Sequence, residues 1–245
     1  MSSLSTRQGF GEAFADAGSD SRLVSLSADL TESTQMHLFK KKYPERFFEV
    51  GVAEQNLVTV ASGLAATGFK PFVASYAAFS PGRCLEQIRT TIALNNQNVK
   101  IVGAHAGLSV GPDGATHQAL EDLSQMLSIP NIEVYSPIDY SQSYALTKEL
   151  VKTSKPAYLR LSREANENIS DNFTFNFRQP LELIQGEDIV CVSIGPVTVE
   201  AYYAVIELKK KYPKHSIGLI NLHCLNPLNL ESIFKYLLRA RLVVV

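Results

Sequence analysis

The sequence contains no apolar run that approaches the about 18–20 residues needed to span a bilayer, so a membrane-embedded protein is not expected. The first residues, Met-Ser-Ser-Leu-Ser-Thr-Arg, lack the apolar segment of a secretory signal peptide. Cysteine is scarce as well. Cys84, Cys191 and Cys224 are widely spaced and odd in number, which predicts reduced thiols rather than a disulfide framework or a zinc site. Together these features predict a cytoplasmic protein.

An excess of charge of one sign is also absent, because the formal net charge is −1. A surface that binds nucleic acid or an anionic membrane is therefore not expected. The composition, with 45% hydrophobic and 19% charged residues, is typical of a globular protein with a sizeable core. A length of 245 residues fits one large domain or two ordinary ones.

Segments rich in β-branched residues alternate with amphipathic segments as far as residue 161. The expected strands lie at residues 22–27, 72–76, 99–104, 132–135 and 157–161. The expected helices, in which apolar residues recur at helical spacing, lie at residues 54–67, 85–95 and 139–153. This alternation predicts an α/β fold with a parallel sheet covered by helices on both faces. Because such sheets bind ligands beyond the carboxyl ends of their strands, the loops that follow strands are the candidate site.

The pattern breaks after residue 163, where a polar, asparagine-rich segment begins. We interpret residues 1–163 as one domain, residues 164–186 as a linker and residues 187–245 as a smaller α/β domain. The expected elements of the second domain are, in order, a strand at 188–194, a helix at 198–212, a strand at 217–222, a helix at 230–238 and a strand from 242. Since no helix follows the last strand, this domain is expected to be incomplete.

The most informative segment, residues 46–56, reads RFFEVGVAEQN and places Glu54 at the start of an expected helix. A glutamate in the first turn of a helix is ordinary, because it favours the positive end of the helix dipole. By itself Glu54 therefore says little about function.

A second informative segment, residues 103–118, reads GAHAGLSVGPDGATHQ and follows an expected strand. Its glycines allow the backbone to approach a ligand closely. Its histidines, His105 and His117, are able to donate to sugar hydroxyls or phosphate, or to transfer protons. A flexible surface loop is the alternative interpretation, although binding residues often lie on loops of a rigid scaffold.

Two further segments follow expected strands. Residues 27–33 read SADLTES and include Asp29 and Ser33. Residues 75–83 read SYAAFSPGR and include Tyr76 and Phe79. An aromatic residue is more often part of a core, but the end of a strand favours a stacking platform for a flat ligand.

All four segments, in register along the chain, resemble the thiamine-diphosphate (ThDP) enzymes of the transketolase family. The resemblance implies a ThDP pyrimidine-binding domain followed by a transketolase C-terminal domain. It implies that Glu54 is the carboxyl that activates the cofactor, through a hydrogen bond to a nitrogen of its pyrimidine ring. The cofactor's own amino group then removes the thiazolium C2 proton. Asp29, Tyr76 and Phe79 match positions that contact the cofactor.

The resemblance also implies substrate-binding roles. His117 and Asp113 match positions near the reacting carbons of the sugar, and His117 is with Glu54 a candidate catalytic residue. His105, Arg7 and Ser33 match positions that hold the phosphate of the acceptor. One departure concerns the family pattern Arg-Pro-x-Asp, which here reads Ser136-Pro137-Ile138-Asp139. The arginine that would bind phosphate bidentately is replaced by Ser136, which puts the identity of the acceptor in doubt.

The Gly-Asp-Gly motif with which full-length transketolases hold the diphosphate and Mg²⁺ is missing from the sequence. The nearest segment, Pro112-Asp113-Gly114, has proline in place of the first glycine. The chain thus resembles the C-terminal subunit of a split transketolase. We expect an N-terminal partner subunit that holds Mg²⁺ and the diphosphate, a dimer of such heterodimers, and no activity of this chain alone.

Three alternatives remain open. A deoxyxylulose-phosphate synthase or a 2-oxoacid dehydrogenase E1 β subunit would share the architecture, although His105 and His117 in their segment favour transketolase. A non-catalytic subunit that keeps the fold is the third.

The reaction expected of a transketolase is transfer of a two-carbon ketol unit from a ketose or its phosphate to an aldose or its phosphate.

Overall fold

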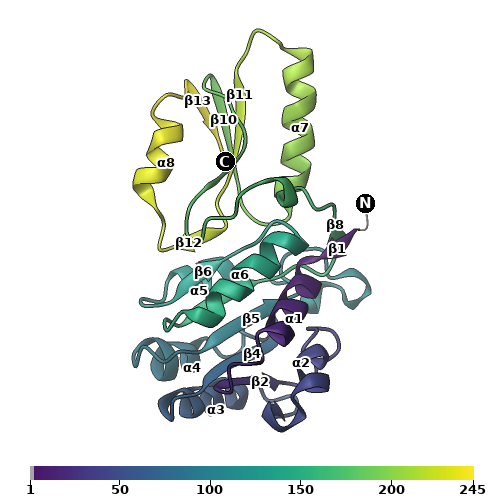
Figure 1. Cartoon of the computed structure of the whole chain (residues 1–245), viewed down its shortest axis with the longest axis vertical. Helices are drawn as coiled ribbons and strands as arrows, with labels where there is room; N and C mark the ends of the chain where they lie inside the picture. Colours follow the sequence, from purple (N-terminus) through teal and green to yellow (C-terminus); the bar gives the residue numbers. More distant parts are fainter. Residues whose placement is uncertain (1–2) are drawn as a thin grey trace.

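The computed structural model describes residues 3–245, which form two α/β units stacked along the long axis of the molecule (Figure 1). The larger unit is built on a seven-stranded sheet. In order across that sheet the strands are β12 (Cys224–Asn226), β6 (Glu133–Tyr135), β7 (Ala157–Arg160), β5 (Lys100–Ala104), β4 (Lys70–Tyr76), β2 (Leu23–Ser27) and β3 (Phe47–Glu49). All neighbours are parallel except β12, which runs antiparallel to β6. The expected parallel α/β fold is confirmed.

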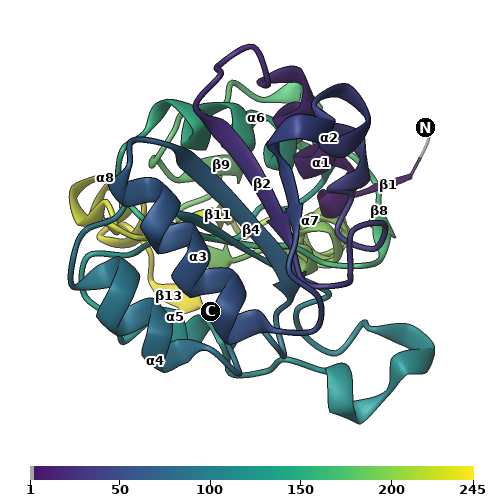
Figure 2. The same cartoon turned by 90° about the horizontal axis from the view of Figure 1, so that it is seen from below.

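Helices cover both faces of this sheet, as the view from below shows (Figure 2). One face carries α1 (Thr6–Asp16), α2 (His37–Lys42) and α6 (Tyr140–Lys152). The other carries α3 (Glu54–Ala66), α4 (Leu85–Gln87), the π-helical turn Ile88–Ala93 that continues it, and α5 (Asp122–Leu127). Along β4 the side chains alternate between the faces, with Phe72 in one core and Val73 in the other, as the period of a strand requires.

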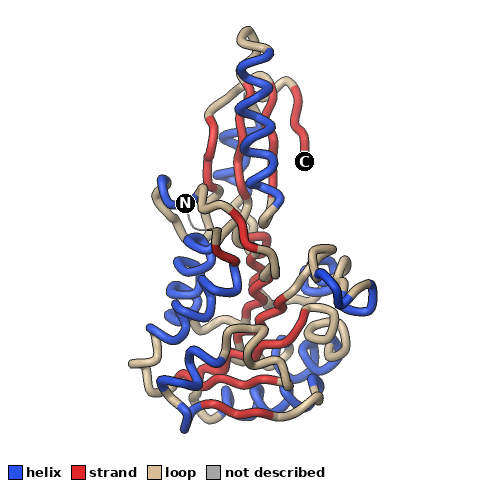
Figure 3. The backbone as a smooth tube through the Cα atoms, turned by 90° about the vertical axis from the view of Figure 1, so that its right-hand side faces the viewer, coloured by secondary structure: helices blue, strands red, loops and turns tan. Residues whose placement is uncertain are grey.

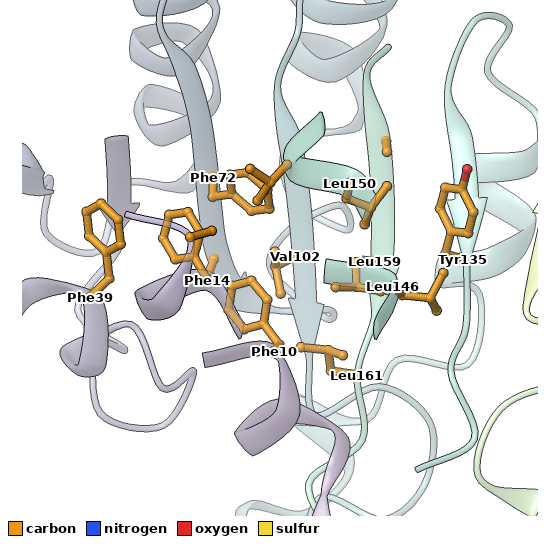
Figure 4. Close-up of a cluster of buried hydrophobic side chains, with 14 of the residues drawn as sticks. Phe10, Phe14, Phe39, Phe72, Val102, Tyr135, Leu146, Leu150, Leu159 and Leu161 are labelled. Carbon is orange, nitrogen blue, oxygen red and sulfur yellow. The ribbon is translucent and has the colours of Figure 1, made fainter. Parts of the chain in front are cut away.

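The core beneath α1 and α2 is aromatic (Figure 4). The ring of Phe14 lies 4.4 Å from that of Phe39 and 4.5 Å from that of Phe72, measured between centroids. Phe10, which stacks on Phe14, is fully buried like the other three. Burial of each such ring stabilises the fold by about 1.5–3 kcal/mol, so α1 is fixed firmly against the sheet.

Caps define where α1 and α6 begin. Ser5 and Gln8 form a capping box at the start of α1, in which the Ser5 backbone N–H donates to Gln8 Oε1 over 2.8 Å. The buried carboxylate of Asp139 accepts from the backbone N–H of Gln142 at the start of α6, and also from the backbone N–H and hydroxyl of Ser170. The start of α6 is thereby tied to the segment that leads into the smaller unit.

The smaller unit is a four-stranded sheet with α7 (Val197–Lys211) and α8 (Leu230–Leu237) (Figure 3). Its strands, in order, are β13 (Leu242–Val244), β10 (Ile189–Ser193), β11 (Ile217–Asn221) and β9 (Leu181–Ile184). The expected strands and helices of this unit are all present. The antiparallel strand β9 was not expected, and it lies inside residues 164–186 together with β8 (Ala165–Asn166) and a 3-10 turn, Ser170–Asn172. The division into domains at these residues stays a prediction.

Two pairings join distant segments. β1 (Leu4–Ser5) pairs antiparallel with β8, so the segment before α1 lies beside the segment after β7. After β11 the chain returns to the larger sheet, where β12 pairs with β6 through Cys224 and Tyr135. Among residues 3–245, no helix combines the length and the apolar character needed to cross a membrane.

Candidate active site

Three parallel strands at the centre of the larger sheet deliver candidate residues to one edge. β2 ends at Ser27 shortly before Asp29, β4 ends at Tyr76, and β5 ends at Ala104 directly before His105. Because the three strands are neighbours and parallel, their carboxyl ends meet at this edge. The loop between β5 and α5, which carries Asp113 and His117, projects from the same edge (Figure 2).

Four of the predicted residues form an aromatic cluster. The Tyr76 ring stacks on that of His105 at 3.9 Å between centroids, and on that of Phe79 at 6.0 Å. The His117 ring meets Phe79 edge-on at 5.1 Å. Tyr76 and His105 are buried, whereas Phe79 and His117 are half-buried, so the cluster is open on one side. Such an arrangement offers flat apolar surface together with two imidazoles.

Glu54 is the first residue of α3 and is only 2% exposed. Its Oε2 accepts from Nη1 of Arg83 over 3.0 Å. The Arg83 guanidinium also lies over the ring of Phe79, 4.5 Å from its centroid, while half of the Arg83 side chain faces solvent. Arg83 therefore links the buried carboxylate to the aromatic cluster. Sequence reasoning missed this residue, which stands in the quoted segment SYAAFSPGR.

The backbone of Asp29 is in the left-handed region, with φ of 59°, and is held there by Glu49. The Glu49 carboxylate accepts from the backbone N–H of Asp29 over 2.8 Å, from the Thr31 hydroxyl over 2.9 Å and from the backbone N–H of Gly51 over 3.0 Å. Glu49 thus joins the turn after β2 to the loop before α3. It was also missed, although it lies in the segment RFFEVGVAEQN.

The predicted phosphate-binding residues form a basic region. Nη1 of Arg7 donates to the backbone carbonyl of Ser33 over 2.8 Å. Burial, followed by the charge of Arg163, lowers the pKa of Arg7. Burial is also the main cause that lowers the pKa of His105 to about 4, with contributions from Arg7 and Arg163 that Asp113 partly opposes. His105 is therefore neutral near pH 7.

The hydroxyl of Ser136 forms no hydrogen bond with the side chains of this basic region. Its side chain is buried, and its hydroxyl has no hydrogen-bond partner among residues 3–245. Gly195 covers it so closely that a Cβ at position 195 would lie 2.7 Å from Ser136 Oγ.

In the part of the chain that the structure describes, no group of three His, Cys, Asp or Glu side chains is arranged to hold a metal ion.

Comparison with protein families finds the pyrimidine-binding domain of transketolase over residues 2–167. A protein of Methanocaldococcus jannaschii, provisionally named a transketolase C-terminal section, is 39% identical over 94% of this chain and 73% of its own length. The 6-deoxy-6-sulfo-D-fructose transketolase subunit SqwH of a Clostridium species is 34% identical, over 93% of this chain and 70% of that protein.

Solved structures of similar fold are transketolases as well. A split-gene transketolase, described as an inactive β4 tetramer, superposes with a TM-score of 0.88 at 34% identity, covering 99% of this chain and 79% of that one. Transketolase of Campylobacter jejuni shares the fold, with a TM-score of 0.84 at 22% identity over 98% of this chain and 39% of that one. This chain belongs to the transketolase family of ThDP-dependent enzymes and corresponds to its C-terminal section.

Proposed function

We propose that this chain is the C-terminal subunit of a split transketolase that moves a two-carbon ketol unit from a ketose or its phosphate to an aldose or its phosphate. The observation that carries the proposal is the buried carboxylate of Glu54, joined through Arg83 to the aromatic cluster of Tyr76, Phe79 and the two histidines. A carboxylate that is 2% exposed and has, within residues 3–245, a single, solvent-facing partner is suited to bind a ligand nitrogen when that partner withdraws.

The residues at this edge fit the pyrimidine half of ThDP. Tyr76 and Phe79 would provide the apolar surface for the ring, Glu54 the carboxyl for a ring nitrogen, and the Asp29 turn backbone groups. The bound cofactor would supply the stabilised carbanion that ketol transfer requires. The chain's own contribution is to hold Glu54 away from water and to release it from Arg83.

The substrate would lie over the same edge, between the cofactor and the loop after β5. His117 and Asp113 would contact sugar hydroxyls near the reacting carbons, and His117 would exchange protons there. His105, Arg7 and Ser33 would hold the phosphate of the acceptor. The proximity of Arg7 to Ser33, and the neutral state of His105 among cations, support these roles.

A second polypeptide completes the site in this proposal and holds the diphosphate with its Mg²⁺. The support comes from relatives of which this chain spans 73% and 70%, one named a C-terminal section and the other a subunit. The similar split-gene structure, described as an inactive tetramer of β chains, supports the need for that second chain. A dimer of heterodimers in the cytoplasm is the proposed assembly, and three free cysteines fit a reducing compartment.

Reconstitution tests this proposal. The chain is assayed for ketol transfer with ThDP and Mg²⁺, alone and after mixing with the diphosphate-binding subunit. Activity is expected only in the mixture, and tight Mg²⁺-dependent ThDP binding by the chain alone would contradict the split site. Because two relatives named 1-deoxy-D-xylulose-5-phosphate synthase are each 33% identical to this chain, pyruvate decarboxylation is the necessary second assay. Decarboxylation without ketol transfer would favour that alternative, and neither activity would favour a non-catalytic subunit.

Replacement of the central carboxyl provides the residue-level test. Glu54→Gln in the assembled enzyme is expected to lower turnover by about a hundredfold or more, because an amide replaces a proton-exchanging group. Glu200→Gln is the matched control, since Glu200 lies exposed in the first turn of α7 in the smaller unit. Near-normal turnover of the Glu54→Gln enzyme would remove Glu54 from the chemistry.

A further inference from the structure

Two segments that the proposed cofactor site needs leave the sheet from neighbouring strands. β2 and β3 run parallel, and their last residues, Ser27 and Glu49, lie opposite each other. Beyond these residues the chain turns at Asp29 after β2, and after β3 it leads through Gly51 to Glu54 at the start of α3. The Asp29 turn and the start of α3 therefore begin side by side, but the strand pairing ends before either of them is reached.

Both segments have a conformation that their own residues do not secure. The backbone of Asp29 lies in the left-handed region, which a residue with a side chain disfavours. Helix α3 begins after Ala53, which offers no side-chain cap, whereas Ser5 and Asp139 cap α1 and α6. At Gly51, where φ is 72°, no atom of residues 3–245 beyond its chain neighbours lies within 4 Å of the position that a Cβ would take. Packing therefore does not hold the loop before α3 either.

The carboxylate of Glu49 connects the two segments. Its Oε1 accepts from the backbone N–H of Asp29 over 2.8 Å and from that of Gly51 over 3.0 Å. Its Oε2 accepts from the hydroxyl of Thr31 over 2.9 Å. An exposed glutamate on a strand is ordinarily a solvated charge, but here both oxygens are engaged by the protein, and one oxygen serves both segments. Because hydrogen bonds to an ionised acceptor are about twice as strong as neutral ones, this single side chain is able to fix the spacing of the two segments.

We propose that Glu49 is a positioning residue, which sets the space between the Asp29 turn and the start of α3 to fit the pyrimidine half of ThDP. It acts through the backbone of Asp29 and through the Gly51 loop that leads to Glu54, and it does not contact the cofactor. The proposal rests on the proposed function, because that function assigns both segments to the cofactor. Without Glu49 the two segments would have to be ordered when the cofactor binds, which weakens binding.

Two substitutions separate the hydrogen bonds of Glu49 from its charge. Glu49→Gln keeps an oxygen where both backbone N–H groups donate, and its amide nitrogen is able to donate to the Thr31 hydroxyl, which also accepts. All three contacts are thus kept without the charge. Glu49→Ala removes the three contacts together. Glu45→Ala is the matched control, since Glu45 is an exposed glutamate just before β3 whose carboxylate pairs with the neighbouring Arg46.

Cofactor binding is measured by calorimetry, with ThDP and Mg²⁺ titrated into the assembled, ThDP-free enzyme. Glu49→Ala is expected to raise the Kd for ThDP about tenfold or more, whereas the Kd of Glu49→Gln stays within about threefold of wild type. The KM for the acceptor sugar is expected to stay unchanged at saturating ThDP, because Glu49 acts on the cofactor segments alone. Wild-type affinity of Glu49→Ala overturns the proposal. An equal loss in Glu49→Gln overturns it as well, because the effect would then come from charge rather than from position.

Amide hydrogen exchange in the free chain provides a readout that does not need the cofactor. In Glu49→Ala the backbone N–H groups of Asp29 and Gly51 are expected to exchange about tenfold faster than in wild type, and in Glu49→Gln at rates close to wild type. The amides of β5 serve as the internal reference. Equal exchange of Asp29 and Gly51 in wild type and Glu49→Ala overturns the proposal, whatever the activity of the enzyme. If these amides respond as expected and the assembled wild type binds no ThDP, the proposed function fails, while Glu49 still ties the two segments together.

Discussion

Two buried carboxylates of this chain each begin a helix and pair with an arginine, but the two arginines differ in how far they are exposed to solvent. Glu54 and Asp122 are each the first residue of a helix, 2% and 1% exposed, with one arginine nitrogen at 3.0 Å and 2.9 Å. Asp122 has a second donor, the buried Tyr158 hydroxyl at 2.8 Å, and its Arg160 is 19% exposed. Among residues 3–245, Glu54 has only Arg83 as a partner, and the Arg83 side chain is 51% exposed.

The difference separates a structural ion pair from one that is able to open. The core covers one side of the ion pair between Asp122 and Arg160, which we call the closed pair. Gly107 covers the other side, so closely that a Cβ at position 107 would lie 3.3 Å from Arg160 Nη2. The ion pair between Glu54 and Arg83, which we call the open pair, is covered only by the half-exposed side chain of Arg83. Withdrawal of Arg83 into solvent would let a ligand donor take its place on Glu54, whereas withdrawal of Arg160 would leave the buried charge of Asp122 without a replacement.

Removal of the closed pair's arginine should produce the largest effect on stability. Arg160→Gln leaves the Asp122 charge buried with only the Tyr158 hydroxyl, so the free energy of unfolding is expected to fall by about 3–5 kcal/mol. Urea unfolding of the free chain, followed by circular dichroism, measures the change. A loss no greater than that of Arg83→Gln would erase the distinction between the two pairs.

Buried histidines give the next largest effect on stability. His223, at the contact between the units, is 1% exposed, and burial lowers its pKa to about 4, as it does for His105. Since the unfolded chain binds these protons near pH 6.5, the stability is complete above pH 6.5 and is lost as the pH falls toward 4.

His223→Gln removes one of these titrating groups. Between pH 7 and pH 4.5 the variant is expected to lose about 2 kcal/mol less unfolding free energy than wild type. Urea titrations at a series of pH values give the slope of the unfolding free energy against pH for wild type and for the variant. Parallel slopes would mean that His223 does not contribute to acid lability.

Removal of the open pair's arginine should produce the smallest effect. Arg83→Gln is expected to lower the unfolding free energy by about 1 kcal/mol, less than Arg160→Gln does, because the half-exposed guanidinium of Arg83 is already screened by solvent. The same urea experiment measures it beside Arg160→Gln. A loss as large as that of the closed pair would show that Glu54 depends on Arg83 for its structure.

The sequence predicts the central strands well, because β2, β4 and β5 are runs of apolar and β-branched residues whose pattern is local. It does not reveal β12, whose three residues pair with β6 about 90 positions away, nor β9, whose four residues lie within the expected linker. Pairings of this kind depend on tertiary contacts that leave no periodicity in a short strand.

The candidate site shows the same limit. Tyr76, Phe79, His105 and His117 stand in motifs, and the structure brings them together. Arg83 lies 29 positions from Glu54, and its contact depends on the path of the intervening strand and turn. Glu49 acts through backbone N–H groups of two loops, which no residue type in the sequence signals. Their roles in function remain predictions.

The central claim is that the carboxyl of Glu54 is held buried and releasable in order to activate ThDP. The most direct measurement is the rate at which the C2 proton of ThDP exchanges with deuterium in the assembled enzyme, followed by NMR after rapid quenching. Glu54→Gln is expected to slow this exchange by about a hundredfold or more without a change in unfolding free energy. Equal exchange rates in wild type and Glu54→Gln would contradict the account.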